Sequence, residues 1–163
     1  MQRFPVDMKM LLFLALFLAA SSGTEVKVYK GTSSYNSDIL CTVRSGKVYK
    51  GRSNYQSDIT CTIRGNQIYK GSSNYRSDVL YTVRDGKVYK GTSTYNSDIL
   101  MTVRDGKIYR GTSTYNSDII ATVRDGVVYD GRSNYRSDIR YTIDGHLTLE
   151  EFVAVWHTVM YVW

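Results

Sequence analysis

Residues 88–107 read VYKGTSTYNSDILMTVRDGK, and this twenty-residue stretch decides the fold because the chain repeats it. Two β-prone runs, 88–90 and 99–104, flank a polar segment, and Asp105-Gly106 then leads into the next β-prone run. Asp-Gly between such runs favours a type I′ turn, since both central residues of that turn need a positive φ. The stretch therefore predicts a β-hairpin with a two-residue turn.

The stretch recurs every twenty residues from Val28 onward, and the spacing is unbroken until one residue is lost before Gly145. All six copies keep the pattern Tyr-x-Gly-x-Ser-x-Tyr-x-Ser-Asp, with a threonine four residues after the aspartate. Such regular spacing indicates that every copy meets the same neighbours in space. The composition, 42% hydrophobic and 22% charged over 163 residues, is typical of a globular domain.

The order of the strands predicts a closed ring. The repeats begin with the second strand of a hairpin, 26–30, and end with the first strand of another, 139–143. If the ends met, these two strands would form a sixth hairpin and hide the edges that an open sheet exposes. We therefore expect a mainly β fold over residues 24–146, with six hairpin repeats in a pseudo-sixfold ring. If the true unit is instead strand, polar segment, strand, an open solenoid is the alternative.

The alternation of side chains predicts which face of each hairpin is buried. A two-residue turn places Val103 opposite Ile108, and Ile99 and Met101 then lie on the same face as Val103. We expect this face to form the core. The other face is expected to meet water or tyrosine rings, and it carries Leu100, Thr102, Arg104, Lys107 and Tyr109.

Residues 147–163 change period and predict a helix. Thr148 and Glu151 have the spacing of a capping box. The apolar residues that follow recur at three- and four-residue spacing, as in an amphipathic helix: Phe152, Val155, Trp156, Val159, Met160 and Trp163. We expect this helix to bury its stripe against the repeats as a cap or plug. The alternative, a membrane-surface helix, usually carries lysine or arginine on its polar face, and this segment has neither.

Residues 1–23 have the three parts of a secretory signal peptide: charged residues up to Lys9, the apolar run 10–20, and small residues at 19–23. The apolar run is about half the ~20 residues that a membrane-spanning helix needs, which disfavours an uncleaved anchor. We therefore expect export to the periplasm, the cell surface or the medium. Contact with the membrane is expected only through this segment before cleavage.

Two sets of equivalent side chains are candidate ligand-binding residues. One set of tyrosines offers rings on which sugars or quaternary ammonium groups stack, although packing between hairpins is the alternative. One set of aspartates could form a ring of carboxylates, although Ser-Asp pairs in turns usually hydrogen-bond the local backbone, and we favour that role. The candidates are Tyr35, Tyr55, Tyr75, Tyr95, Tyr115, Tyr135, Asp38, Asp58, Asp78, Asp98, Asp118 and Asp138.

Few side chains suit catalysis or metal binding. No histidine precedes His146 in any repeat, so the repeated serines have no neighbouring histidine to act as a base. Residues 144–152, DGHLTLEEF, resemble the second half of an EF-hand loop, but Arg140 occupies the position of the first carboxylate ligand. We therefore expect no metal, no cofactor and no enzymatic activity.

Cys41 and Cys61 occupy the same position in adjacent repeats. Equivalent strands of neighbouring units are expected about 9–10 Å apart, since two strand spacings separate them. A disulfide needs Cα atoms within roughly 7 Å. The sequence therefore predicts two unpaired thiols, even in an exported protein.

The net charge of +6 would suit an acidic partner only if the positive charges gathered on one face. Lysines such as Lys50 and Lys90 instead alternate with aspartates in every unit, so we expect no nucleic-acid partner.

Residues 88–100, VYKGTSTYNSDIL, together with the ending 147–152, LTLEEF, resemble the short Tyr/Ser-rich β-hairpin repeats of exported bacterial proteins, some of which are described as β-flowers. The resemblance covers nearly all of the chain after residue 23. It implies the fold but no activity and no catalytic residues.

More distantly, twenty-residue aromatic hairpins are similar to choline-binding cell-wall repeats, whose tryptophans this repeat lacks. From the repeats and residues 1–23 together we expect an exported, non-enzymatic structural or interaction module with an envelope protein or a glycan as partner. The alternative is a module that binds a glycan or a choline-like ligand through the repeat tyrosines.

Overall fold

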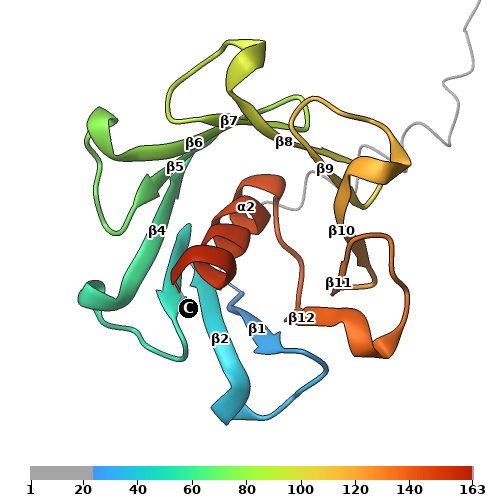
Figure 1. Ribbon diagram of the computed structural model, residues 1–163. Helices are drawn as coiled ribbons and strands as arrows, with labels where there is room; N and C mark the ends of the chain where they lie inside the picture. Colours follow the sequence, from blue (N-terminus) through green and yellow to red (C-terminus); the bar gives the residue numbers. More distant parts are fainter. Residues whose placement is uncertain (1–23, 163) are drawn as a thin grey trace, which may run out of the picture.

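The computed structural model describes residues 24–162, so the predicted signal peptide and Trp163 lie outside the described part of the chain (Figure 1). Within that part, antiparallel strands form one closed sheet in which each strand pairs with its neighbours in sequence. The strands are β1 (Val26–Lys30), β2 (Ile39–Arg44), β3 (Lys47–Lys50), β4 (Ile59–Arg64), β5 (Gln67–Lys70), β6 (Val79–Arg84), β7 (Lys87–Lys90), β8 (Ile99–Arg104), β9 (Lys107–Arg110), β10 (Ile119–Arg124), β11 (Val127–Asp130) and β12 (Ile139–Asp144).

The predicted closure of the ring is confirmed by the pairing of β1 with β12, in which Val28 lies opposite Ile143. The closing contacts are the same as those between other repeats. The Thr142 hydroxyl donates to the Gly31 carbonyl at 2.7 Å, as the Thr42 hydroxyl donates to the Gly51 carbonyl at 2.7 Å. Residues far apart in sequence therefore complete a sixth unit equivalent to the other five.

Two kinds of connection alternate around the ring. Four of the five short hairpin turns have the predicted type I′ character, as at Asp85 and Gly86, whose φ values are 52° and 72°. The turn between β4 and β5 differs, since Gly65 has a positive φ and Asn66 does not. The longer connections each end in a 3₁₀ turn: η1 (Asn36–Asp38), η2 (Gln56–Asp58), η3 (Arg76–Asp78), η4 (Asn96–Asp98), η5 (Asn116–Asp118) and η6 (Arg136–Asp138). These longer connections are the outward loops in Figure 1.

Every repeat contains a β-bulge, which changes the face of the sheet on which one predicted core residue lies. Met101 pairs with Val88, but Ile99 pairs with Tyr89, so Leu100 is an extra residue in the ladder. The bulge moves Ile99 to the face opposite Met101, and the expectation that both share one face is wrong. Ile99 is nevertheless buried, because it belongs to a second apolar layer on the outer side of the sheet.

The outer layer also contains residues of the face that we expected to meet water or tyrosine rings. Thr102 and Tyr109 lie opposite each other and are both buried. Where a tyrosine of this set meets an arginine, the guanidinium covers the ring, as Arg44 does over Tyr49 at 4.7 Å from the centroid. Thr102 thus faces a tyrosine, one of the two expected neighbours, and its hydroxyl does not need water because it bonds a backbone carbonyl.

The inner layer is a belt with one fully buried side chain from each repeat. Val28 and its five equivalents have 0% exposure and belong to the central cluster: Val48, Ile68, Val88, Ile108 and Val128. Six β-branched residues at one height line the ring with aliphatic surface. The space inside this belt is filled from the C-terminal segment.

The C-terminal segment forms the plug of the ring. Helix α2 (Leu149–His157) begins with the predicted capping box and continues as a π-helical turn, η7 (Thr158–Val162). In Figure 1, α2 lies within the outline of the ring, and its residues 152–156 belong to one buried cluster with the inner belt. Residues 151–156 are all buried, so the helix is covered on every side and not only along the predicted stripe. Met160, which belongs to that stripe, is 36% exposed because η7 emerges from the ring.

No helix within residues 24–162 has both the length and the apolar character that crossing a membrane requires.

The hairpin turns offer a test of the fold through two glycines. A Cβ on Gly86 would lie 2.7 Å from the Val103 carbonyl oxygen of the next hairpin, whereas a Cβ on Gly31 would meet no atom within 4 Å. Both have positive φ, 72° and 55°, so alanine is strained at either position by about 1–2 kcal/mol. We expect Gly86→Ala to lower the free energy of unfolding by at least ~1 kcal/mol more than Gly31→Ala. Urea unfolding measures the difference, and equal losses would contradict the tight packing of adjacent hairpins.

Candidate functional site

Six tyrosines project from the long connections into solvent. Their exposed fractions are 71–75%, which makes them the most exposed aromatic side chains of residues 24–162. They are the tyrosines predicted as candidates: Tyr35, Tyr55, Tyr75, Tyr95, Tyr115 and Tyr135. The tyrosines of the strands, such as Tyr89 and Tyr109, are buried in the outer layer. Packing therefore accounts for the strand set and leaves the loop set available for contacts.

A serine and an aspartate hold each exposed tyrosine in place. In the fourth loop the Ser93 hydroxyl donates to Asp98 Oδ2 at 2.6 Å and accepts from the Tyr95 amide at 3.2 Å. The Asp98 amide donates to the Tyr95 carbonyl at 3.0 Å, which closes the 3₁₀ turn. The same three contacts recur in all six loops.

The candidate aspartates thus have a structural partner within their own loops. The sequence favoured hydrogen bonds from these residues to the local backbone. In the structure the carboxylate instead accepts from a serine hydroxyl, and it is that hydroxyl which accepts from a backbone amide. At Asp138, hydrogen bonds from Ser133 and Ser137 lower the pKa of the carboxyl group. Within residues 24–162 no three histidine, cysteine, aspartate or glutamate side chains come close enough to hold a metal ion. The structure does not bring the six carboxylates together.

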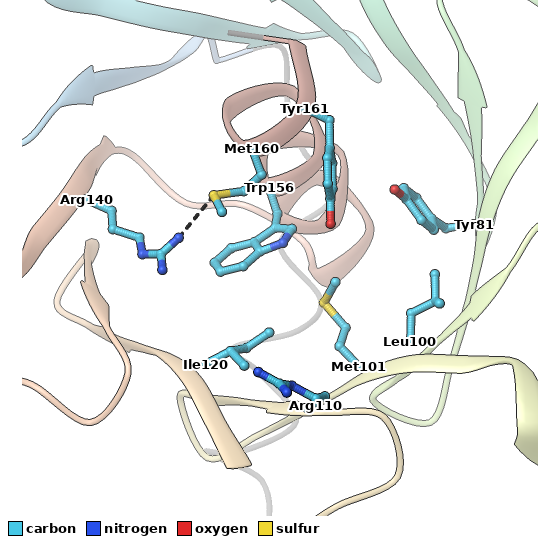
Figure 2. Close-up of a pocket in the computed structure, with 9 residues that line it drawn as sticks. All are labelled: Tyr81, Leu100, Met101, Arg110, Ile120, Arg140, Trp156, Met160 and Tyr161. Atoms are coloured by element: carbon cyan, nitrogen blue, oxygen red, sulfur yellow. Dashed lines mark hydrogen bonds between the residues drawn. The ribbon is translucent and has the colours of Figure 1, made fainter. Parts of the chain in front are cut away.

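A second candidate site lies inside the ring, where sequence reasoning placed none. It is a pocket of about 330 Å³ between the end of the plug and strands β6, β8, β9, β10 and β12 (Figure 2). Its walls combine aromatic, aliphatic and cationic side chains: Tyr81, Leu100, Met101, Arg110, Ile120, Arg140, Trp156, Met160 and Tyr161. The signal for it in the sequence is that several of these residues occupy positions at which the repeats differ.

Arg140 is held on one wall of the pocket by several contacts. Its Nε donates to Asp130 Oδ1 at 3.1 Å, and Nη2 donates to the same oxygen. Its Nη1 lies 3.2 Å from the Met160 sulfur, as Figure 2 shows. The guanidinium carbon is 5.8 Å from the centroid of the Trp156 ring, within range of a cation–π contact. These contacts fix the guanidinium at the boundary between plug and ring.

On the opposite wall, Tyr81 and His157 form a neutral pair. The Tyr81 hydroxyl and His157 Nδ1 are 2.7 Å apart, and the Tyr161 ring lies on the histidine at 5.4 Å between centroids. Burial lowers the pKa of His157, and burial raises the pKa of Tyr81 to about 12. Both groups are therefore uncharged at neutral pH, and the hydrogen bond ties the end of α2 to β6.

Cys41 and Cys61 are unpaired in the structure, as predicted, and both are buried. Burial raises the pKa of Cys61 to about 12 and raises that of Cys41 above its ordinary value as well. Thiols that stay protonated are poor nucleophiles and act as small apolar fillers. Beside them, Thr60 and Thr158 hydroxyl oxygens lie 2.7 Å apart and join the plug to β4.

The chain matches a family model described as "6-fold beta flower protein" over residues 28–156. It belongs to this family. The closed ring of six hairpins agrees with that description and with the resemblance drawn from the repeats. No curated protein and no solved structure matches this β-flower protein.

The neutral state of His157 predicts a dependence of stability on pH. Because burial lowers its pKa in the folded state, the unfolded chain binds a proton more readily than the folded chain. The stability that depends on neutral His157 is complete above the unfolded pKa of about 6.5 and is lost as pH falls towards the lower folded pKa. We expect the urea midpoint to fall between pH 7 and pH 5, and to fall less in His157→Gln. An equal fall in both proteins would show that other groups cause the effect.

Proposed function

We propose that this β-flower protein is an exported, non-enzymatic interaction module that binds its partner through the six loop tyrosines. The observation that carries the proposal is the exposure of these tyrosines, 71–75%, on loops that are each fixed by the same serine and aspartate. A large apolar ring left in solvent six times at equivalent positions contributes nothing to the core. Exposed aromatic side chains that are already ordered suit binding, since little conformational freedom is lost on contact.

The sixfold repetition favours a partner that is itself repetitive. A single exposed tyrosine supplies only a weak contact, but linked contacts to one partner act at a high effective concentration and strengthen one another. A partner with a repeated motif, such as a polysaccharide or an envelope protein with repeats, meets this condition. The loops that carry these tyrosines project outward around the ring (Figure 1).

A glycan is the partner class that the loop chemistry fits best. Tyrosine rings stack on the apolar faces of sugars, and polar side chains beside them bond sugar hydroxyls. Each loop provides both, because exposed residues such as Asn96 and Ser97 follow the exposed Tyr95. A choline-like cation would require several rings around one point, and here the rings stand on separate loops.

Two features support the absence of an enzymatic role and the export of the chain. The loop serines bond aspartates and backbone amides of their own loops, and His157 Nδ1 is engaged by Tyr81, so neither set forms a serine–histidine pair. Residues 1–23 have the composition of a secretory signal peptide. An exported protein with outward aromatic loops would meet envelope glycans directly.

The test is binding to an array of polysaccharides by the chain and by two matched variants. We expect saturable binding that weakens at least about tenfold in Tyr95→Ala/Tyr115→Ala, because two of the stacking contacts are lost. Asn96→Ala/Asn116→Ala alters neighbouring side chains of the same loops and is expected to weaken binding less. Circular dichroism should show that both variants keep the fold, since these side chains are exposed.

Changing all six loop tyrosines to alanine should abolish binding. Unchanged binding by that variant would refute the role of the tyrosines, and binding to no polysaccharide at all would refute the glycan as partner.

A further inference from the structure

The pocket inside the ring exists because the plug lies off centre. Helix α2 packs against β2, β3, β4 and β5, where the inward residues Cys41 and Cys61 are small. The Thr60–Thr158 contact holds it on that side. The opposite side of the ring, formed by β6 to β12, is left farther from the plug, and the pocket of about 330 Å³ occupies this space (Figure 2). This volume lies at the lower end of the range for small-molecule sites, about 300–1,000 Å³.

Some pocket residues differ in type from the equivalent residues of the other repeats, and packing of the core does not require these differences. The bulge position is aliphatic or threonine in five repeats and arginine only at Arg140. The last residue of the second strand is lysine in four repeats, but it is Arg110 in the fifth and Asp130 in the sixth. Asp130 bonds Arg140 and fixes its direction. In the loops, in contrast, the glycine, the two serines, the tyrosine and the aspartate are identical in all six repeats.

The charges around the pocket leave one cation without a counterion. Arg140 is paired with Asp130. Arg110 lines the pocket, and no hydrogen bond or ion pair joins its side chain to another residue within 24–162. In Figure 2 its guanidinium lies beside Ile120 and Met101 at the edge of the cavity. An arginine next to apolar walls is suited to a carboxylate, which it bonds with two parallel N–H donors.

The remaining walls are apolar and aromatic. Trp156 and Tyr161 come from the plug, and Leu100, Met101 and Ile120 come from the ring. The Tyr81–His157 pair is neutral and adds no charge. A pocket with one free cation and an apolar interior favours a ligand with one negative group and an apolar body.

We propose that this pocket binds a small organic monoanion, with Arg110 holding its carboxylate and the apolar walls holding an aromatic or aliphatic body. Arg140 also lines the pocket but is already paired with Asp130, which leaves Arg110 as the cation for the carboxylate. The site is separate from the loop tyrosines on the outside of the ring and does not depend on their function.

The experiment compares a charged probe with its neutral amide in the full chain. Isothermal titration calorimetry with 3-phenylpropionate should give saturable binding with a Kd below about 1 mM, and 3-phenylpropionamide should bind at least about tenfold more weakly. Equal affinity for acid and amide would overturn the role of the arginine. Absence of binding by the acid at about ten times that concentration would overturn the site itself.

Three variants locate the binding. Arg110→Met should weaken 3-phenylpropionate at least about tenfold and leave the amide unchanged, because one charged contact is removed. Lys90→Met is the matched control, since Lys90 occupies the same position in the preceding repeat and is outside the pocket lining. It should bind like the original chain. Leu100→Trp should fill the cavity and abolish binding of both probes, with unchanged circular dichroism as evidence of folding.

The proposal is overturned if Arg110→Met binds the acid as well as the original chain does, if Lys90→Met weakens it equally, or if folded Leu100→Trp still binds. Tyr95→Ala/Tyr115→Ala should retain full binding of 3-phenylpropionate, which separates this site from the glycan contacts on the loops.

Discussion

The pairing of β1 with β12 is the constraint on which the rest of the structure depends. It removes both edges of the sheet and fixes the number of hairpins in the ring at six, since no further strand has a free edge to pair with. A ring of this size leaves an interior that inward side chains alone do not fill. The inner belt, which includes Val28 and Val128, therefore packs around a helix, and residues 151–156 are buried on every side.

The plug lacks the symmetry of the ring that surrounds it. Side chains of an α-helix project at about 100° intervals, so six identical hairpins cannot pack against it equally well. The inward positions after the bulge accordingly differ between repeats, with Cys61 on the packed side and Tyr81 and Met101 on the open side. The outer loops have no helix beside them, so the same serine–aspartate hydrogen bond recurs in every loop. The chain thus keeps the same serines, tyrosine and aspartate in every outer loop, whereas its interior is asymmetric.

The hairpins, the closed ring, the capping box at Thr148 and the unpaired thiols were all predictable, because each follows from spacing or local chemistry. The bulge at Leu100 was not, since a continuous β-prone run gives no sign of an extra residue, and the face of Ile99 was wrong for that reason. The loop tyrosines were identified as candidates from the sequence, and the structure adds that they are exposed whereas strand tyrosines such as Tyr89 are buried. The pocket depends on where the plug lies between distant strands, which no local pattern specifies.

A disulfide across the closing pair of strands tests the closed ring most directly. Lys27 and Asp144 are opposite residues in the β1–β12 ladder, and opposite Cα atoms in an antiparallel pair lie about 4.5–5.5 Å apart, which suits a disulfide. The buried Cys41 and Cys61 should not compete, since their thiols stay protonated. In Lys27→Cys/Asp144→Cys, oxidation should give one intramolecular disulfide in the monomer and raise the melting temperature. Dimers linked by disulfides, or reduced thiols under oxidising conditions, would contradict closure.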